Sequence, residues 1–347
     1  MNINEFNYDL PKELIAQFPT VRRDQSRLLI VDRKRGSITH SVFEEIVDLF
    51  KPGDALVIND AKVRPVRLIG NVSGKKIDIL LVERVKKNLY LVKAKPAARL
   101  KPGAEIEFYN KDVTALYKQT ESSGQRGLKL LEFMQELDIE SKLDQLGMMP
   151  LPPYIKRIPD DQDSVRYQTV YAKAEGAIAA PTAGLHFTKQ ILSKLEQKQV
   201  DIATLTLNVG LGTFVPVRVE NIKEHKMHSE YFELSQSAAA TINQVIKNKG
   251  RVCAVGTTAA RVLETCAGQD NNRIKLQPKA DNTDLFIYPP YKFKAADMLL
   301  TNFHLPRTTL LMLVYAFAGE ELCRRAYSEA IKQRYRFYSY GDCMLII

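Results

Sequence analysis

The pattern of hydrophobic positions changes along the chain, from short strands to alternating helices and strands. Apolar runs bounded by Gly, Pro or Asp predict strands at residues 26–33, 54–63 and 77–85. Between Val63 and Phe108, turn signals recur about every ten residues, which is typical of a small β-barrel. The run "LKLLEF" (128–133) predicts one more strand there, followed by a short helix that ends at Gly147.

After the proline-rich connector "MPLPPYIKR" (149–157), the apolar spacing becomes that of a layered α/β domain. Helices are predicted at 188–200 with Thr188 as the cap, at 235–250 between Ser235 and Gly250, at 257–268 and at 308–319. Strands are predicted at 201–210, 251–256 and 296–303, of which "RVCAVG" indicates a central strand buried on both faces. The sequence therefore predicts an α/β fold: a layered α/β main domain (residues 1–60 and 156–347) with an inserted small β-barrel domain (61–155).

Composition indicates the class of protein. The 347 residues are 45% hydrophobic, enough for a sizeable core, and no run of 18 apolar residues indicates a membrane span. The N-terminus lacks a signal-peptide pattern, and the four cysteines have no CxxC spacing, which indicates reduced and mostly buried thiols. We expect a cytoplasmic protein, without a membrane partner and monomeric by default.

Positive charge is concentrated in the predicted barrel and connector. The formal net charge is +10, and residues 61–157 hold 19 Lys and Arg against 11 Asp and Glu, so they supply most of that excess. This asymmetry indicates a nucleic-acid partner, and a lysine-rich solvated surface is the alternative. The candidate phosphate contacts are Lys75, Lys76, Lys93, Lys95, Lys156 and Arg157.

Three strand-to-helix junctions carry polar residues that packing does not require. They are "PTAGLHFT" (181–188), "VGTTAAR" (255–261) and "TNFHLPRTT" (301–309). In layered α/β sheets, ligands bind outside the carboxyl ends of strands, where helix N-termini offer N–H groups to anions. The "GTT" run fits such an anion cradle, and an ordinary helix cap is the alternative. The candidate ligand-binding residues are Thr182, Gly184, Phe187, Gly256, Thr257, Thr258, Asn302 and His304.

Four of the five histidines lie in polar segments of this kind. His186 lies in the first junction, where a chain reversal needs proline and glycine but no imidazole, and local packing is the alternative to a chemical role. His225 and His228 are three apart in "HKMHSE", a spacing that could place them on one helix face, and Glu230 follows. No further ligands occur at metal-site spacing, which favours acid–base chemistry over metal binding.

Two glycines, Gly210 and Gly212, follow a predicted strand in "LNVGLGTF". A dinucleotide-binding G-x-G-x-x-G motif needs a third glycine, which is missing here. The pair therefore indicates a bulge, or a close approach of the backbone to a ligand.

Long segments of the chain resemble one family of tRNA-modifying enzymes. The segments are "YDLPKELIAQFP", "DQSRLLIVDR", "LPPYIKRIPDDQDSVRYQTVYA", "AAPTAGLHFT", "LNVGLGTFVPV", "EHKMHSE", "VGTTAARVLE", "TDLFIYPPYKFKAADMLLTNFHLPRTTLLMLVYAFAG" and "YRFYSYGDCMLI". They run in order from Tyr8 to the last residues and are similar to the S-adenosylmethionine:tRNA ribosyltransferase-isomerases of queuosine synthesis. The chain departs from the family pattern at Asn208, where histidine is usual, and at Pro290, where glycine is usual.

The resemblance implies a reaction and a fold. The family transfers the ribosyl part of S-adenosylmethionine onto 7-aminomethyl-7-deazaguanine at the wobble position of a tRNA. The ribose is isomerised to an epoxycyclopentanediol, which gives epoxyqueuosine with release of adenine and methionine. The implied fold is an α/β domain with an inserted β-barrel. S-adenosylmethionine is consumed as a substrate, and no metal or redox cofactor is expected.

This chemistry suggests roles for the candidate residues. His186 and His228 are the hypothetical base and acid, in either order, and Glu230 orients an imidazole. The residues of the "GTT" run hold the methionine carboxylate, while Asn302 and His304 face the adenosyl group. Tyr154 or Tyr167 is expected to stack on an unpaired tRNA base. Two other classes stay open: a basic RNA-binding module without catalysis, and an S-adenosylmethionine-dependent RNA methyltransferase.

Overall fold

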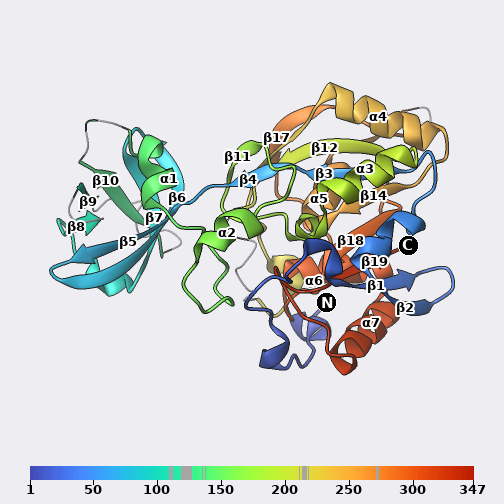
Figure 1. The fold of residues 1–347 in the computed structure, drawn as a ribbon, viewed down its shortest axis with the longest axis horizontal. Helices are drawn as coiled ribbons and strands as arrows, with labels where there is room; N and C mark the ends of the chain where they lie inside the picture. The colour runs from blue at the N-terminus through green and yellow to red at the C-terminus, as the bar shows by residue number, and fades with distance from the viewer. Residues whose placement is uncertain are drawn as a thin grey trace. The chain divides into compact units, whose positions relative to one another are not determined.

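The chain forms two folding units, one built on a mixed β-sheet and the other on a closed β-barrel (Figure 1). The structure is a computed structural model. It describes residues 1–108, 112–118, 127–134, 136, 138–210, 212, 217, 219–270 and 273–347. The first unit comprises Met1–Lys62, Pro153–Arg157 and Gln168–Ile347, and the barrel unit comprises Val63–Pro152 and Ile158–Tyr167. The predicted fold class, a layered α/β domain with a small β-barrel, is confirmed.

The sheet of the first unit has nine strands in the order β17-β13-β12-β3-β14-β18-β19-β1-β2. The four central strands β12, β3, β14 and β18 run parallel, while β19 is antiparallel to β18 and parallel to β1. The nine strands of this sheet are β1 Arg27–Asp32, β2 Ser37–Val42, β3 Ala55–Asn59, β12 Asp201–Leu207, β13 Glu230–Leu234, β14 Val252–Val255, β17 Lys279–Thr283, β18 Met298–Asn302 and β19 Cys343–Ile346. Shorter strands are β4 Ala61–Val63, β11 Ala174–Ala177, β15 Ala267–Asp270 and β16 Arg273–Leu276.

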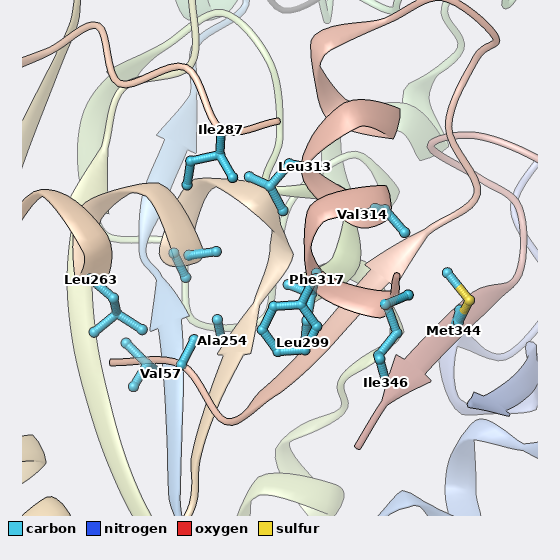
Figure 2. Close-up of a cluster of buried hydrophobic side chains, with 14 of the residues drawn as sticks. Val57, Ala254, Leu263, Ile287, Leu299, Leu313, Val314, Phe317, Met344 and Ile346 are labelled. Carbon is cyan, nitrogen blue, oxygen red and sulfur yellow. The ribbon is translucent and has the colours of Figure 1, made fainter. Parts of the chain in front are cut away.

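Every residue of β3, β14, β18 and β19 is buried, because helices cover both faces of the sheet. Alternate side chains along a strand point to opposite faces. Val57, Ala254 and Leu299 pack with helix residues such as Leu263 and Phe317 on one face (Figure 2). Residues of the other parity pack against α3 and the 3₁₀ helix Phe43–Leu49 on the other face. Truncating one of these buried leucines to alanine typically costs about 2–5 kcal/mol.

The predicted helices of the first unit are confirmed, although α3, α4 and α5 each end before the predicted residue. Thr188 and Ser235 accept backbone hydrogen bonds as the N-caps of α3 and α4, and Gly319 ends α6. Helix α4 ends at Lys247 rather than at Gly250, because Asn248 already serves as its C-cap. The bounds are α3 Lys189–Gln197, α4 Gln236–Lys247, α5 Gly256–Cys266, α6 Thr309–Ala318 and α7 Glu320–Lys332. The sequence patterns used above did not indicate α7 or β19.

The barrel unit closes six antiparallel strands in the order β10-β7-β6-β5-β8-β9. Alternating burial along β7 and β9 places one set of side chains inside, as a small barrel requires. Strand β10 and the short helix ending at Gly147 lie where the sequence predicts them. The bounds are β5 Arg67–Val72, β6 Lys75–Lys86, β7 Leu89–Lys95, β8 Glu105–Phe108, β9 Val113–Lys118, β10 Lys129–Phe133, α1 Leu143–Leu146 and α2 Asp161–Arg166.

All four cysteines are buried and unpaired, as expected from their spacing. Within the described ranges, no helix combines the length and apolar character needed to cross a membrane.

Candidate active site

One edge of the nine-stranded sheet brings the predicted junctions together. The parallel strands β12, β3, β14 and β18 all end there, so the segments after Leu207, Val255 and Asn302 are neighbours. Strand β19 is antiparallel to β18, with Cys343 paired to Asn302, and β1 pairs Leu28 with Cys343. The beginnings of β19 and β1 therefore reach the same edge.

A pocket at this edge, here named the α5 pocket, collects most of the predicted ligand-binding residues. Thr182, Gly256, Thr257, Thr258, Asn302 and His304 line it. The rest of its lining is Tyr154, Thr301, Thr308, Tyr338 and Ser339 with the apolar residues Ala179, Ala180, Pro181, Ala183, Val209, Leu305 and Leu310. The sequence patterns singled out Tyr154 for stacking on tRNA but did not indicate Tyr338 or Ser339.

The N-terminus of α5 offers donors to this pocket. The first N–H groups of a helix have no partner within the helix, and Val255, at the N-cap position, supplies no side-chain hydrogen bond. Gly256 has φ of +89°, a conformation that favours glycine at this turn. The buried Thr258 Oγ1 has no hydrogen-bond partner among the described residues. Unpaired donors, together with the positive end of the helix dipole, suit a carboxylate or phosphate.

The amide nitrogen of Asn302 has hydrogen-bond partners, whereas the amide oxygen has none among the described residues. Its Nδ2 lies 3.1 Å from His186 Nε2 and donates more weakly to the carbonyl oxygens of Tyr338 (3.3 Å) and Asp342 (3.4 Å). Its Oδ1 is buried and has no partner in the described part of the chain. An unpaired buried acceptor costs roughly 1–3 kcal/mol. A ligand that donates a hydrogen bond in the α5 pocket removes that cost.

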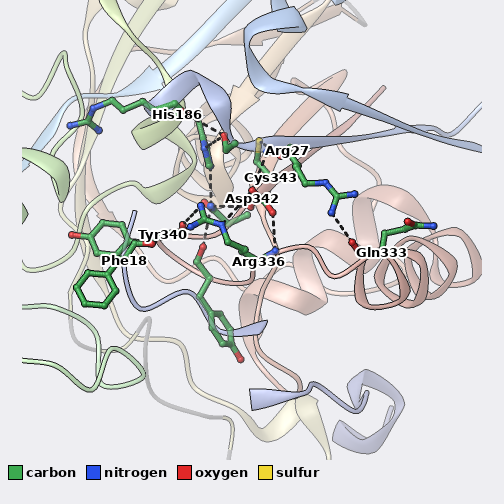
Figure 3. Close-up of polar contacts among 12 residues, drawn as sticks. Phe18, Arg27, His186, Gln333, Arg336, Tyr340, Asp342 and Cys343 are labelled. Atoms are coloured by element: carbon green, nitrogen blue, oxygen red, sulfur yellow. Dashed lines mark hydrogen bonds and ion pairs between the residues drawn. The ribbon is translucent and has the colours of Figure 1, made fainter. Parts of the chain in front are cut away.

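His186 is buried, bonds to Asn302, and is not among the residues that line the α5 pocket. Figure 3 shows His186 among the polar side chains around it. Because Asn302 donates to Nε2, the proton of the neutral ring lies on Nδ1 and is donated to Ser26 Oγ over 2.7 Å. The ring also packs on Phe43, with centroids 5.2 Å apart. Burial, reinforced by the charges of Arg336 and Arg23, lowers the pKa of His186 to about 3.

This environment answers why an imidazole occupies the 181–188 junction. Both ring nitrogens are engaged, the ring is neutral near pH 7, and its partners come from β18 and from the segment before β1. The contacts support a residue that orients Asn302, whereas the acid–base role of His186 stays a prediction.

His304 lines the α5 pocket as a neutral imidazole. Its Nε2 lies 2.7 Å from Thr301 Oγ1, and burial lowers its pKa to about 3. Its backbone is fixed by two tyrosines: the N–H donates to Tyr327 Oη over 3.0 Å, and Tyr8 Oη donates to the carbonyl oxygen. The ring therefore keeps one orientation in the pocket and can hydrogen-bond a ligand without carrying charge.

Two stacked tyrosines form an aromatic wall of the α5 pocket. The rings of Tyr154 and Tyr338 have centroids 4.5 Å apart and an interplanar angle of 27°. Tyr154 Oη is 2.5 Å from Ser339 Oγ, while Tyr338 Oη is buried without a partner among the described residues. Tyr154 stacks on Tyr338, and its stacking on a tRNA base stays a prediction. Tyr167, the other candidate, is fully buried, so its expected role on tRNA is wrong.

A second pocket, here named the His228 pocket, adjoins the first, because Leu310 lines both. It is lined by Gly212, His225, Met227, His228, Glu230, Arg261, Leu285, Phe286, Ile287, Thr309, Leu310 and Leu313. His228 is half-buried, and a Cβ at Gly212 would lie 2.2 Å from its Cδ2, so the imidazole needs a glycine at that position. His225 packs on Phe286, and burial next to His228 lowers the pKa of His225.

The helical arrangement considered for His225 and His228 is wrong. The 3₁₀ helix Ile222–Glu224 ends at His225, and both histidines lie in an irregular segment before β13. They still meet in one pocket, because Phe286 and Gly212 pack against them.

A buried ion pair between Glu230 and Arg261 lines the His228 pocket. Glu230 and Arg261 are both nearly inaccessible, and Arg261 Nη1 donates to Glu230 Oε2. Glu230 Oε1 accepts from the Gly210 N–H over 2.9 Å, which ties the glycine segment to β13. Arg261 was missed from the sequence, although an arginine among the small and apolar residues of "TTAARVLETC" signals a buried partner. Removing one member of such a pair typically costs about 3–5 kcal/mol.

Two predicted ligand-binding residues, Gly184 and Phe187, are packed against other side chains, and their part in binding stays a prediction. A Cβ at Gly184 would lie 2.1 Å from Tyr171 Oη, so glycine is needed for this close approach. Phe187 is fully buried and packs edge-on to Phe43 at 4.9 Å. Neither residue is in the lining of the two pockets described above.

The predicted phosphate-binding lysines of the barrel unit are exposed on two neighbouring strands. Lys75 and Lys76 begin β6, and Lys93 and Lys95 alternate outward on β7. Lys156 is exposed in the first unit, and Arg157 is half-buried there, with its Nε donating to the Gln17 carbonyl oxygen over 2.9 Å.

No group of three His, Cys, Asp or Glu side chains in the described ranges is arranged to hold a metal ion. His225, His228 and Glu230 therefore share a pocket without forming a ligand set.

Comparison with known proteins finds relatives that match nearly the whole chain. Residues 3–346 match the family model described as "Queuosine biosynthesis protein". The S-adenosylmethionine:tRNA ribosyltransferase-isomerase of Acetivibrio thermocellus is 47% identical over 348 residues, with 100% of both chains covered. That of Caldanaerobacter subterraneus subsp. tengcongensis is 49% identical over 349 residues, again with 100% of both covered. The crystal structure of S-adenosylmethionine tRNA ribosyltransferase from Thermotoga maritima is similar with a TM-score of 0.56 and 36% identity, covering 99% of this chain and 100% of that one.

Proposed function

Since the chain belongs to the queuosine biosynthesis protein family, we infer that it acts as an S-adenosylmethionine:tRNA ribosyltransferase-isomerase. It moves the ribosyl part of S-adenosylmethionine onto 7-aminomethyl-7-deazaguanine at the wobble position of a tRNA. The ribose is isomerised, epoxyqueuosine forms, and adenine and methionine leave. The observation that carries this conclusion is the full-length match to relatives that are 47–49% identical. S-adenosylmethionine is a substrate in this reaction, so we propose that no cofactor is needed.

We propose that the α5 pocket holds S-adenosylmethionine by its methionine end. The carboxylate is a compact anion, and the N-terminal N–H groups of α5 with Thr258 Oγ1 are donors without partners among the described residues. Hydrogen bonds to a charged group contribute roughly 1.5–3 kcal/mol each, about twice as much as neutral ones. Gly256, Thr257 and Thr258 therefore act as the carboxylate cradle, and Thr182 lines the same pocket.

The adenosyl end would lie along the aromatic wall. Tyr154 and Tyr338 offer a flat surface to a purine, and the vacant Asn302 Oδ1 can accept from an exocyclic amine or a ribose hydroxyl. His304, neutral and fixed in orientation, hydrogen-bonds the departing adenine without adding a charge.

We propose that His228 is the residue that transfers a proton in the reaction. The sulfonium makes the ribose C5′ protons acidic, and a half-exposed imidazole in a pocket adjoining the α5 pocket can take or give a proton. Glu230, with Arg261, fixes the pocket around that imidazole. His186 contributes by holding Asn302, which distinguishes it from the acid–base role expected from the sequence alone.

The tRNA is the second substrate, and the exposed lysines of the barrel unit support its docking there. Lys75, Lys76, Lys93 and Lys95 are proposed to neutralise phosphates, with Lys156 and Arg157 contacting the RNA from the first unit. We propose that the enzyme works as a monomer in the cytoplasm, where tRNA is its partner.

Product analysis tests the reaction. The protein is incubated with S-adenosylmethionine and a tRNA that carries the aminomethyl precursor, and both small molecules and digested nucleosides are analysed by mass. Adenine, methionine and epoxyqueuosine are expected, and a tRNA with unmodified guanine at the wobble position is the control. Release of S-adenosylhomocysteine would instead identify a methyltransferase, and tRNA binding without any product would identify a binding module.

A further inference from the structure

An aromatic ring and an aliphatic side chain, three positions apart in the sequence, are both exposed on the first unit. Phe18 is 58% exposed and Val21 is 94% exposed, in the segment between the 3₁₀ helices Lys12–Leu14 and Arg23–Gln25. Large apolar side chains so open to water are few among the described residues, whose other phenylalanines are mostly buried. An exposed phenylalanine that packing does not require suggests a surface for binding.

Hydrogen bonds hold the Gln17 side chain and the Phe18 carbonyl in place. Gln17 donates from Nε2 to the Tyr154 carbonyl oxygen over 3.0 Å and accepts from the Lys156 N–H over 2.8 Å. Arg336 Nη1 donates to the Phe18 carbonyl oxygen over 3.2 Å (Figure 3). A ring on a fixed backbone loses little conformational freedom when it binds, so it is preorganised for contact.

One cationic side chain packs on this ring, and an exposed lysine directly precedes that cationic residue in the sequence. The guanidinium of Arg157 lies over the Phe18 ring, 4.4 Å from its centroid. The neighbouring Lys156 is exposed, whereas Arg22, which is 54% exposed, is ion-paired with Asp24 (3.1 Å) and Glu44 (3.7 Å). An aromatic platform among basic side chains is the arrangement by which proteins bind single-stranded nucleic acid: bases stack on the ring while cations attract phosphates.

The platform adjoins the α5 pocket through the connector Pro153–Arg157. Gln17 bonds to the backbone of Tyr154 and Lys156, and the Tyr154 ring lines the α5 pocket. Phe18 therefore directly follows Gln17, whose side chain bonds to the backbone of Tyr154 in the lining of the α5 pocket. In an anticodon loop the bases are unpaired and can be splayed onto aromatic side chains.

We propose that Phe18 is a stacking platform for an unpaired anticodon-loop nucleotide next to the base that is modified. The inference rests on the proposed function, because it takes tRNA as the substrate. Two exposed apolar side chains are far too small for a stable protein interface, which buries about 800 Å² per partner. A phenyl ring has no hydrogen-bonding groups, so the platform accepts any base and fixes position rather than sequence.

The test measures binding of an anticodon stem-loop RNA to the full-length protein. The RNA carries 2-aminopurine beside the wobble position, whose fluorescence is quenched when the base stacks. Phe18→Ala should weaken binding by about 5- to 100-fold and abolish protein-dependent quenching, whereas Phe18→Tyr should keep both. The dependence of affinity on salt should keep its slope in Phe18→Ala, because no phosphate contact is lost. Lys156→Gln should instead reduce that slope, by about 0.7–0.9.

Tyr231→Ala is the matched control, because Tyr231 is another exposed aromatic residue (43%) and its side chain points to the face of β13 opposite Glu230. It should bind and quench like the wild type. Wild-type affinity and quenching in a folded Phe18→Ala protein would overturn the inference. So would a wild-type dimer that Phe18→Ala converts to monomers in light scattering, since the patch would then join two copies. The binding assay needs no turnover, so a wild type that binds through Phe18 but releases no adenine would overturn the proposed function and leave the platform standing.

Discussion

Mild acid should destabilise the first unit through two buried histidines, His186 and His304. Burial lowers the pKa of each to about 3 in the folded protein, whereas an unfolded chain has the ordinary value of about 6.5. Between these values the unfolded state binds a proton at each ring and the folded state does not. The free energy of unfolding therefore falls as the pH drops below about 6.5, and this loss ends only near pH 3.

The magnitude follows from the size of the shift. Each histidine contributes a slope of about 1.4 kcal/mol per pH unit in this range. From pH 7 to pH 5 the loss is about 2 kcal/mol for each ring and about 4 kcal/mol for the pair, against a typical total of about 5–15 kcal/mol. Stopping at pH 5 avoids paired carboxylates such as Asp54. Burial raises the pKa of Asp54 less than hydrogen bonds from Arg251 and Lys51 lower it, so it titrates in stronger acid.

The assay is urea unfolding followed by far-ultraviolet circular dichroism at pH 7, 6, 5.5 and 5, since the chain has no tryptophan. His304→Gln removes one buried imidazole and places its amide nitrogen near Thr301 Oγ1, so its pH dependence should be shallower by about 1.4 kcal/mol per unit. Stability that is constant from pH 6.5 to pH 5, or a His304→Gln slope equal to that of the wild type, would refute the reasoning.

The remaining predictions concern the reaction. His228→Ala should lower turnover by about 10²–10⁴-fold with little effect on Tm, whereas His186→Ala should lower both turnover and Tm; a folded His186→Ala protein with full turnover would leave His186 a packing residue. Thr258→Val should raise KM for S-adenosylmethionine about tenfold or more and leave the tRNA KM alone, while Thr265→Val, two turns along α5, should do neither. Exhaustive chelation should leave activity intact, and zinc lost in parallel with activity would contradict this. Lys75→Glu with Lys76→Glu should raise the tRNA KM and reduce the salt slope by about 0.7–0.9 for each lost contact, without changing S-adenosylmethionine binding; wild-type behaviour would exclude this end of β6 from tRNA docking.

Local chemistry accounts for what the sequence predicted well. Thr188 and Ser235 cap their helices by accepting hydrogen bonds from backbone N–H groups three residues later. A few neighbouring residues are therefore enough to predict where each helix begins. The unbroken apolar run of β14 required a central strand. Because the carboxyl ends of parallel strands meet at one edge, the junctions at Gly256 and Asn302 could be expected to share a site.

Contacts between distant segments account for what the sequence did not reveal. His186 meets Ser26 160 residues away and Asn302 116 residues away, and its lowered pKa comes from that burial. Neither partner is visible in the local motif around His186, so the imidazole suggested an acid or base. Similarly, the α7 and β19 segments gave no local signal strong enough to predict, although β19 brings Asp342 to the site edge.

The sequence by itself determined the fold class, the family and the segments that carry chemistry, because periodicity, caps and long motifs act over a few neighbouring residues. Only the tertiary structure decided which of those residues face a pocket. In that structure Phe187 and Tyr167 are buried, Tyr154 stacks on Tyr338, and Phe18 is exposed. The same structure pairs Arg261 with Glu230 across 31 positions. Burial and ion pairing depend on segments that meet only after folding, since desolvation is set by everything packed around a group and not by its neighbours along the chain.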